Sequence, residues 1–190
     1  IRGSQGSGIV VVDAVGTRIG GAGAGDGNVI LRNGTRPSPT FPNPRPDQQA
    51  GISLYRSVDT EVLGNYVGVD PATNEAGGNV GAGLFIEDSR TTRVGREDDL
   101  AAANHFLYNE GAGVRIGRNP GYALNQHDTP ERSDVTYGNT IVWNEIAANG
   151  GPGIHLGGDG VTRNDTRYYD YLARRWVEAD VDDGPNGLVN

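Results

Sequence analysis

The stretch Gly83-Leu84-Phe85-Ile86 belongs to a short phrase in which a glycine precedes two aliphatic residues separated by one variable position. Its other copies are Gly8-Ile9-Val10-Val11, Gly51-Ile52-Ser53-Leu54, Gly113-Val114-Arg115-Ile116 and Gly153-Ile154-His155-Leu156. Alternation with period two predicts a strand with one buried face. Recurrence at intervals of 43, 32, 30 and 40 residues predicts a repeat protein whose units bury their apolar faces against one another.

Two further phrases occur between the copies of this glycine phrase. The threonine phrase reads Thr17-Arg18-Ile19, Thr60-Glu61-Val62, Thr92-Arg93-Val94 and Asn139-Thr140-Ile141. The asparagine phrase begins at Asn28, Asn65, Asn104 and Asn144 and ends at Asn33, Asp70, Asn109 and Asn149. Each unit is therefore expected to supply three short strands, which describes an all-β parallel β-helix. The predicted coils are 17–54, 60–86, 92–116 and 139–156, after a lone strand at 8–12.

The composition agrees with a repetitive β fold. The chain has 31 Gly and 10 Pro in 190 residues, and many glycines occupy fixed places in the repeat, where turns need a positive φ. Cysteine is absent, which removes disulfides and thiolate metal sites. We expect one domain of coils over 1–158, with loop insertions at 35–49 and 118–134, and an acidic, aromatic tail over 159–190 that packs on or caps the coils.

The net charge of the chain limits the classes of partner that it is expected to bind. The 16 basic residues are all Arg, and 24 acidic residues leave a net charge of −8. Such a balance argues against nucleic acid or an anionic membrane as a partner and is compatible with divalent cations. No apolar run is long enough to span a bilayer. The chain starts in the middle of the repeat and contains no Met, so we expect a piece of a longer protein, with any signal peptide upstream.

Several stretches resemble a known family. Ile19-Gly20-Gly21, Leu63-Gly64-Asn65-Tyr66-Val67-Gly68-Val69-Asp70 and Gly81-Ala82-Gly83-Leu84-Phe85-Ile86 look like the right-handed parallel β-helix repeats of bacterial secreted and surface proteins, which are related in fold to pectate lyases. The resemblance implies a right-handed solenoid of about four to five coils and a secreted or cell-surface location. Residues 158–165 and 180–188 are similar to the segment that closes such helices.

Stacking places equivalent outward residues of successive coils side by side. The threonine phrase presents Arg18, Glu61 and Arg93, which we interpret as a charge ladder. The asparagine phrase presents Tyr66, His105 and Glu145, which are candidate catalytic or sugar-stacking groups, or an ordinary polar pair beside a phenol. The glycine phrase presents Ser53, Phe85, Arg115 and His155, of which the last three are a candidate ligand platform.

The remaining candidate structural, metal-binding and ligand-binding residues are asparagines of the repeat and residues of the tail. Asn33, Asp70, Asn109 and Asn149 are predicted to form a structural ladder, with Asn in the left-handed conformation. The tail carboxylates of Asp159, Asp165, Asp180, Asp182 and Asp183 are candidate Ca²⁺ ligands, or solvated turn formers. Residues 166–179 are predicted as a short helix, and their Tyr169 and Trp176 are candidate ligand-binding side chains.

Two functions of different class follow from these patterns. The favoured one is a non-catalytic exported module that acts as a structural or adhesive scaffold, joined to other domains of a longer chain or to a surface assembly, and contacts polysaccharide. The alternative is a polysaccharide lyase, hydrolase or epimerase, because this fold also carries enzymes. An inverting hydrolase would need two carboxylates across a groove, with Asp88, Asp128 and Asp159 as candidates.

Overall fold

The computed structural model describes residues 1–34, 36, 49–117 and 136–156, together with strands at 167–170 and 175–178. Its main part consists of three parallel sheets. Sheet A contains β1 (Ile9–Val12), β4 (Ile52–Tyr55), β7 (Leu84–Glu87), β10 (Val114–Ile116) and β13 (Ile154–Leu156). Sheet B contains β2 (Arg18–Gly20), β5 (Glu61–Leu63), β8 (Arg93–Val94) and β11 (Thr140–Ile141). Sheet C contains β3 (Val29–Ile30), β6 (Tyr66–Val67), β9 (His105–Leu107) and β12 (Glu145–Ala147).

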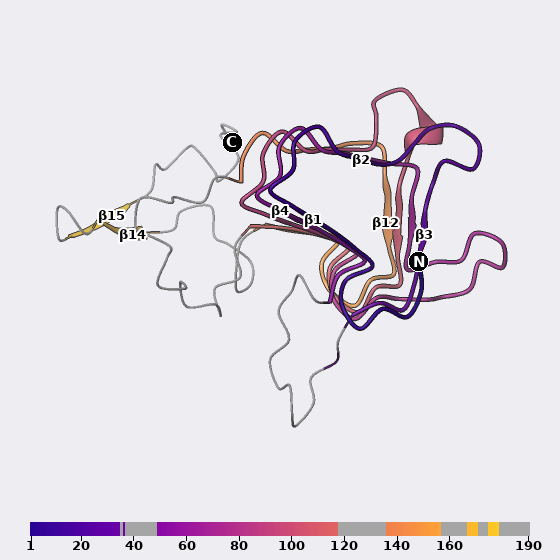
Figure 1. Ribbon diagram of the computed structural model, residues 1–190. Helices are drawn as coiled ribbons and strands as arrows, with labels where there is room; N and C mark the ends of the chain where they lie inside the picture. Colours follow the sequence, from indigo (N-terminus) through magenta and orange to yellow (C-terminus); the bar gives the residue numbers. More distant parts are fainter. Residues whose placement is uncertain (35, 37–48, 118–135, 157–166, 171–174, 179–190) are drawn as a thin grey trace.

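Each coil contributes one strand to each sheet, and Figure 1 looks along the resulting stack. The three phrases of the sequence form the three sheets, and equivalent residues are aligned: Ile52 pairs with Leu84, and Leu84 with Val114. The predicted coils and the strand in front of them are therefore confirmed at the level of stacked parallel strands. This arrangement is solenoid-like and compatible with a parallel β-helix.

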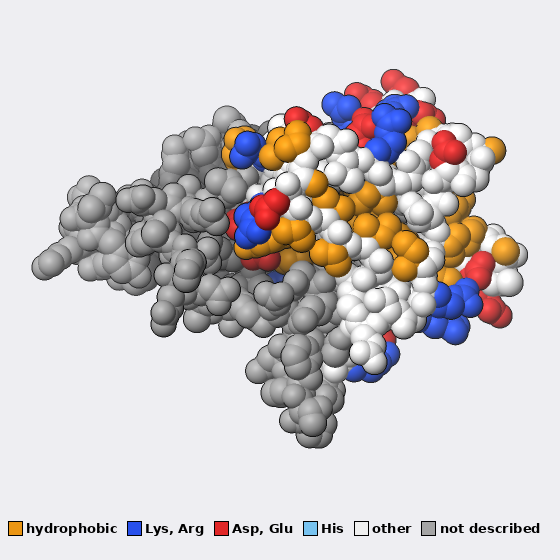
Figure 2. All heavy atoms as spheres, in the orientation of Figure 1, with side chains coloured by type: hydrophobic (Ala, Val, Ile, Leu, Met, Phe, Trp, Pro, Cys, Tyr) orange, Lys and Arg blue, Asp and Glu red, His pale blue; other side chains and the backbone are white. Residues whose placement is uncertain are grey.

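The core lies between the three sheets. Inward positions of the middle coils are fully buried, including Ile52, Leu84 and Val114 of sheet A, Val62 of sheet B and Phe106 of sheet C. Burial of each such side chain contributes roughly 1.5–3 kcal/mol. Figure 2 shows the end of the stack at the first coil, where apolar side chains gather between β1 and β3 and charged side chains lie at the rim.

An asparagine ladder follows sheet C, as predicted, but one of its members differs. It consists of Asn33, Asn79, Asn109 and Asn149. The backbone N–H of each donates to the side-chain Oδ1 of the next over 3.0, 3.2 and 3.0 Å, and the amide Nδ2 donates to the same atom over 3.0, 2.8 and 3.1 Å.

The assignment of Asp70 to this ladder was wrong. After β6 the chain leaves the coil in a turn, which is closed by an antiparallel bridge between Val69 and Ala76, and Asn79 occupies the ladder position instead. Asp70 forms an ion pair with Arg2 over 3.1 Å. The left-handed conformation predicted for the ladder asparagines is adopted instead by the residues that precede them. The φ angle is 54° at Arg32, before Asn33, and 60° at Tyr108, before Asn109.

A second ladder at the start of sheet C was not predicted. Asn28, Asn65, Asn104 and Asn144 repeat the same bonding, with Nδ2 to Oδ1 distances of 2.9, 2.9 and 2.8 Å. Both ladders satisfy buried backbone groups at the corners of the coil, where no strand partner is available. The two corners that flank sheet C are thus held by side-chain amides.

The tail differs from the predicted helix. Strands β14 (Arg167–Asp170) and β15 (Arg175–Glu178) form an antiparallel hairpin in which Tyr169 pairs with Trp176. Aromatic residues and Val favour strands over helices, and this preference decides the local structure. The one short helix among the described residues is the 3-10 helix η2 (Leu100–Ala102), so that part of the chain contains no helix able to cross a membrane. Residues 35 and 37–48 of the predicted insertion 35–49, and the whole of the insertion 118–134, lie outside the described residues.

Candidate functional site

The outer face of sheet C carries the most developed cluster of polar and aromatic side chains. Tyr66 on β6, His105 on β9 and Glu145 on β12 are register partners, so three successive coils present them in one column. The alternation of each strand turns the neighbouring residues Val67, Phe106 and Ile146 towards the core. The column predicted from the sequence therefore exists, and we call it the sheet C column.

The members of the sheet C column contact one another directly. The rings of Tyr66 and His105 are stacked, with centroids 4.5 Å apart and planes inclined by 2°. His105 Nδ1 lies 2.6 Å from Glu145 Oε2. Because the rings stack along the direction in which the coils repeat, the face that each ring turns to the other is occupied. A ligand approaching from solvent would therefore meet ring edges rather than open ring faces.

A hollow of about 340 Å³ lies over this column. The turn between Val69 and Ala76 forms one side of it with Pro71 and Asn74, and Tyr108 and Ala148 form another. The side chain of His105 is 28% exposed and that of Glu145 is 56% exposed, so both groups are accessible from the hollow. The turn after β6, which places Asp70 outside the asparagine ladder, therefore forms one side of the hollow beside the sheet C column.

The side chains that line this hollow can form hydrogen bonds and carry little net charge. A carboxylate at Nδ1 fixes the tautomer of an imidazole and leaves Nε2 to exchange a proton or accept a hydrogen bond. Glu145, Asn74 and the phenol groups of Tyr66 and Tyr108 add further acceptors and donors. Such a set suits a ligand rich in hydroxyl groups.

The candidate platform on sheet A is more enclosed than predicted. Phe85, Arg115 and His155 are register neighbours on β7, β10 and β13, but Phe85 is 1% exposed and Ser53 is fully buried. The guanidinium carbon of Arg115 lies 5.9 Å from the Phe85 ring centroid. A hollow of about 340 Å³ is lined by Phe85, Arg115, His155 and Gln49. Phe85 is thus the floor of a hollow rather than an open stacking surface.

Burial also affects the electrostatics of this hollow. Burial lowers the pKa of Arg115, and the charge of Glu87 opposes that effect. A cation in a hollow on a chain of net charge −8 makes this region locally attractive to anions.

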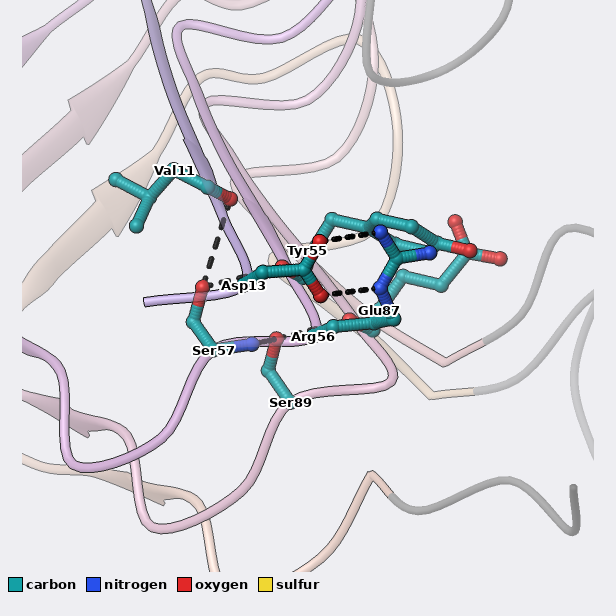
Figure 3. A network of polar contacts seen from close by, with 7 residues as sticks. All are labelled: Val11, Asp13, Tyr55, Arg56, Ser57, Glu87 and Ser89. Carbon is teal, nitrogen blue, oxygen red and sulfur yellow. Dashed lines mark hydrogen bonds and ion pairs between the residues drawn. The ribbon is translucent and has the colours of Figure 1, made fainter. Parts of the chain in front are cut away.

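A third group was missed by the sequence analysis. Arg56 donates from Nε and a terminal nitrogen to the two carboxylate oxygens of Asp13, over 2.5 and 2.6 Å, and its guanidinium lies 4.3 Å from the Tyr55 ring centroid (Figure 3). The hydrogen bonds to Asp13 raise the pKa of Arg56. The equivalent strands β1, β4 and β7 are followed by Asp13, Arg56 and Asp88, with φ of 52°, 49° and 48°. The regular place of these residues after each copy of the glycine phrase was the sequence signal that could have revealed this group.

The candidate charge ladder of sheet B is confirmed. Glu61 lies 2.7 Å from Arg18 and 3.5 Å from Arg93, on the coils on either side. Arg18 and Arg93 are 63% and 60% exposed, so each pair contributes at most about 1 kcal/mol. This column stabilises the sheet locally.

The remaining candidates are only partly covered by the structure. The five proposed Ca²⁺ ligands, Asp159, Asp165, Asp180, Asp182 and Asp183, lie outside the described residues, as does Asp128. Tyr169 and Trp176 are placed in the hairpin as backbone partners. Within the residues that the structure describes, no three His, Asp or Glu side chains are grouped to hold a metal ion.

No family model, curated protein or solved structure matches this chain. Its functional assignment therefore depends on the stacked sheets and on the side chains that they bring together.

Proposed function

We propose that this chain is a non-catalytic, exported module with a right-handed parallel β-helix fold, which serves as a rigid scaffold in a cell-surface or extracellular assembly and contacts polysaccharide. The observation that carries the proposal is the hollow over the sheet C column. It combines a regular, buried framework with an accessible group of donors and acceptors on one lateral face.

The framework supports the scaffold role. Two asparagine ladders and a continuous aliphatic core hold each coil to the next, so the outer residues keep fixed spacings of about 4.8 Å. A polymer with repeating hydroxyl groups can contact several coils of such a surface at once. Saccharides are the class of polymer that offers this repeat together with little charge.

The side chains of the hollow favour a neutral saccharide over a uronate. Glu145 is exposed beside His105, and a ligand carboxylate placed there would lie close to that negative charge. Vicinal hydroxyl groups can instead donate to the Glu145 carboxylate and accept from Asn74 or a phenol. We therefore expect neutral oligosaccharides to bind and to be released intact.

Calorimetric titration with neutral and uronic oligosaccharides, coupled to product analysis, tests this proposal. Glu145→Gln and Asn74→Ala are expected to weaken binding of a neutral oligosaccharide at least tenfold, which corresponds to about 1.4 kcal/mol. Thr140→Ala, an exposed change on sheet B of the same coil, is the matched control and should leave binding unchanged. Cleavage of any oligosaccharide would contradict the non-catalytic assignment, and equal loss in the control would contradict the assignment of the hollow.

Calcium binding remains a separate proposal for the tail carboxylates. Titration of Ca²⁺ into the chelator-stripped protein is expected to show saturable binding, which Asp180→Asn and Asp182→Asn should weaken. Glu145→Gln should not change this titration if the tail alone binds the ion.

A polysaccharide lyase is the second candidate, because one observation favours it. Arg115 lines the hollow on sheet A, and its guanidinium can hold the carboxylate of a uronate there with bidentate hydrogen bonds. Unsaturated products from a uronic oligosaccharide, abolished by Arg115→Gln and retained in Arg93→Gln, would establish this activity and replace the scaffold proposal.

A further inference from the structure

A separate hollow of about 420 Å³ lies at the corner where the chain passes from sheet C to sheet A, and we call it the corner hollow. The turn after β6 contributes to two hollows: Pro71 and Asn74 line the one over the sheet C column, whereas Gly77 and Gly78 line the corner hollow. The two share no lining residue. A hollow of this size can hold a small organic molecule, such as a single sugar ring.

The corner hollow carries positive charge on an acidic chain. It is lined by two arginines, by Val80 and by three glycines, namely Arg32, Arg36, Gly34, Gly77 and Gly78. No acidic side chain of the described residues lines it. The chain as a whole has a net charge of −8. A hollow with two guanidinium groups and no lining carboxylate is therefore locally attractive to anions.

Arg36 forms one side of the corner hollow and is held there by an ion pair. Its guanidinium donates to both carboxylate oxygens of Glu110, and one terminal nitrogen lies 2.9 Å from Oε2. Glu110 lies two coils after Asn33, so the pair spans the coil that contains Val80. Since Glu110 compensates the charge of Arg36, the uncompensated charge of the hollow belongs to Arg32.

Arg32 is a positioned cation without an internal partner. It precedes the ladder residue Asn33 with φ of 54°, and its backbone N–H donates to the Gly77 carbonyl over 2.9 Å. Its guanidinium forms no ion pair or hydrogen bond with any of the described residues. By contrast, ion pairs with Asp or Glu are formed by Arg2, Arg18, Arg36, Arg56, Arg93 and Arg96. The N–H donors of Arg32 are thus available to a ligand.

We propose that the corner hollow binds the oxyanion group of a small acidic ligand, with Arg32 as the main contact and Arg36 as a second positive wall. A guanidinium matches a carboxylate or a sulfate with two parallel hydrogen bonds. The hollow also leaves room for the organic group that carries the oxyanion. Because the site shares no residue with the sheet C column, the inference does not depend on the proposed contact with neutral saccharide.

Nuclear magnetic resonance of the full, nitrogen-15-labelled chain at low ionic strength tests this inference. The probes are glucuronate, glucose sulfate and inorganic sulfate, with glucose as the neutral control. We expect both sugar acids to cause saturable shifts of the Gly77 and Gly78 amides, and glucose to cause none. Arg32→Gln should weaken this binding by about tenfold or more, and Arg32→Lys should weaken it less because the charge is kept.

Arg90→Gln is the matched control. Arg90 is also exposed and forms no ion pair with the described residues, but it does not line the corner hollow. This variant should bind the sugar acids as the natural chain does. Arg32→Gln should fold, because the side chain that it changes is exposed and the hydrogen bond to Gly77 comes from the backbone. Unchanged amide shifts of β4 and β7 would verify that it does.

Several outcomes would overturn the proposal. These are an equal loss in Arg90→Gln, full binding in Arg32→Gln, absence of saturable shifts, or shifts confined to the sheet A hollow around Arg115. Binding of inorganic sulfate without binding of either sugar acid would overturn the organic ligand. Glu145→Gln should leave the titration with glucuronate unchanged, and Arg32→Gln should leave binding of neutral oligosaccharides unchanged. Failure of this site is therefore distinguishable from failure of the proposed saccharide contact.

Discussion

At the scale of single residues, buried asparagine side chains form the hydrogen bonds that a neighbouring strand would otherwise supply to the backbone. Asn109 is 1% exposed and its Oδ1 accepts from both nitrogens of Asn79. Its own Nδ2 donates to the Val67 carbonyl over 3.0 Å and to Asn149 over 3.1 Å. Such a residue cannot be removed without leaving buried donors unsatisfied.

Asn109→Ala is expected to destabilise the fold by on the order of 3 kcal/mol, because it strands two donors of Asn79 and loses its own bonds. For a chain of this size each kcal/mol lowers the melting temperature by roughly 2–4 °C. Thermal unfolding by circular dichroism measures this. Asn149→Ala, in a less buried position at the end of the ladder, should cost less. Altered saccharide affinity at unchanged stability would contradict a structural role for Asn109.

The Asp13–Arg56 pair belongs to the same scale but predicts a small effect. Asp13 is 60% exposed and Arg56 is 35% exposed, so solvent screens the bidentate pair. Arg56→Lys should lower stability by less than about 1 kcal/mol, because it loses one of two hydrogen bonds and the fit over Tyr55. Denaturant unfolding measures the change, and a loss as large as that of Asn109→Ala would show that the pair is not screened.

At the scale of elements, glycines fix how closely neighbouring coils approach. Gly68 has φ of 94°, and a Cβ added there would lie 1.9 Å from the Leu107 carbonyl oxygen and 2.8 Å from Asn109 Oδ1. Gly20 and Gly95 meet the carbonyl of Leu63 or Val142 in the same way. Each glycine makes room for the carbonyl and the ladder asparagine of the next coil.

Gly68→Ala should therefore disrupt both the stacking and the ladder, with a loss of more than about 3 kcal/mol or failure to fold. Gly16→Ala is the matched control, because φ there is 69° and no atom lies within 4 Å of the added Cβ. It should cost only about 1–2 kcal/mol of backbone strain. Chemical denaturation compares the two, and equal losses would show that backbone conformation alone explains these glycines.

At the scale of the whole molecule, each coil contacts only its neighbours, so stability varies along the stack. The strands of the middle coils pair with a neighbouring strand on both edges, whereas β1 is an edge strand of sheet A. Its residues Val10 and Val12 are 51% and 47% exposed. We expect amides of β4 and β7 to exchange most slowly and those of β1 at least tenfold faster. Hydrogen exchange with residue resolution checks this order, and uniform protection would indicate a single cooperative unit.

Sequence alone predicted the strands of the three stacked sheets, their order and their register, because Gly-aliphatic alternation and fixed phrases constrain every coil in the same way. It also placed Tyr66, His105 and Glu145 in one column, since register follows from the repeat. These features are local or periodic, and one repeat copy specifies the next.

Tertiary structure decided whatever depends on distant neighbours. An excursion closed by Val69 and Ala76 moved the ladder from Asp70 to Asn79 and built a wall beside the sheet C column. Packing buried Phe85, although its place in the alternation points outward. Residues 167–170 and 175–178 pair as strands β14 and β15, where the sequence analysis predicted a helix. Loop excursions, burial and pairing involve contacts across coils, which no single phrase of the sequence encodes.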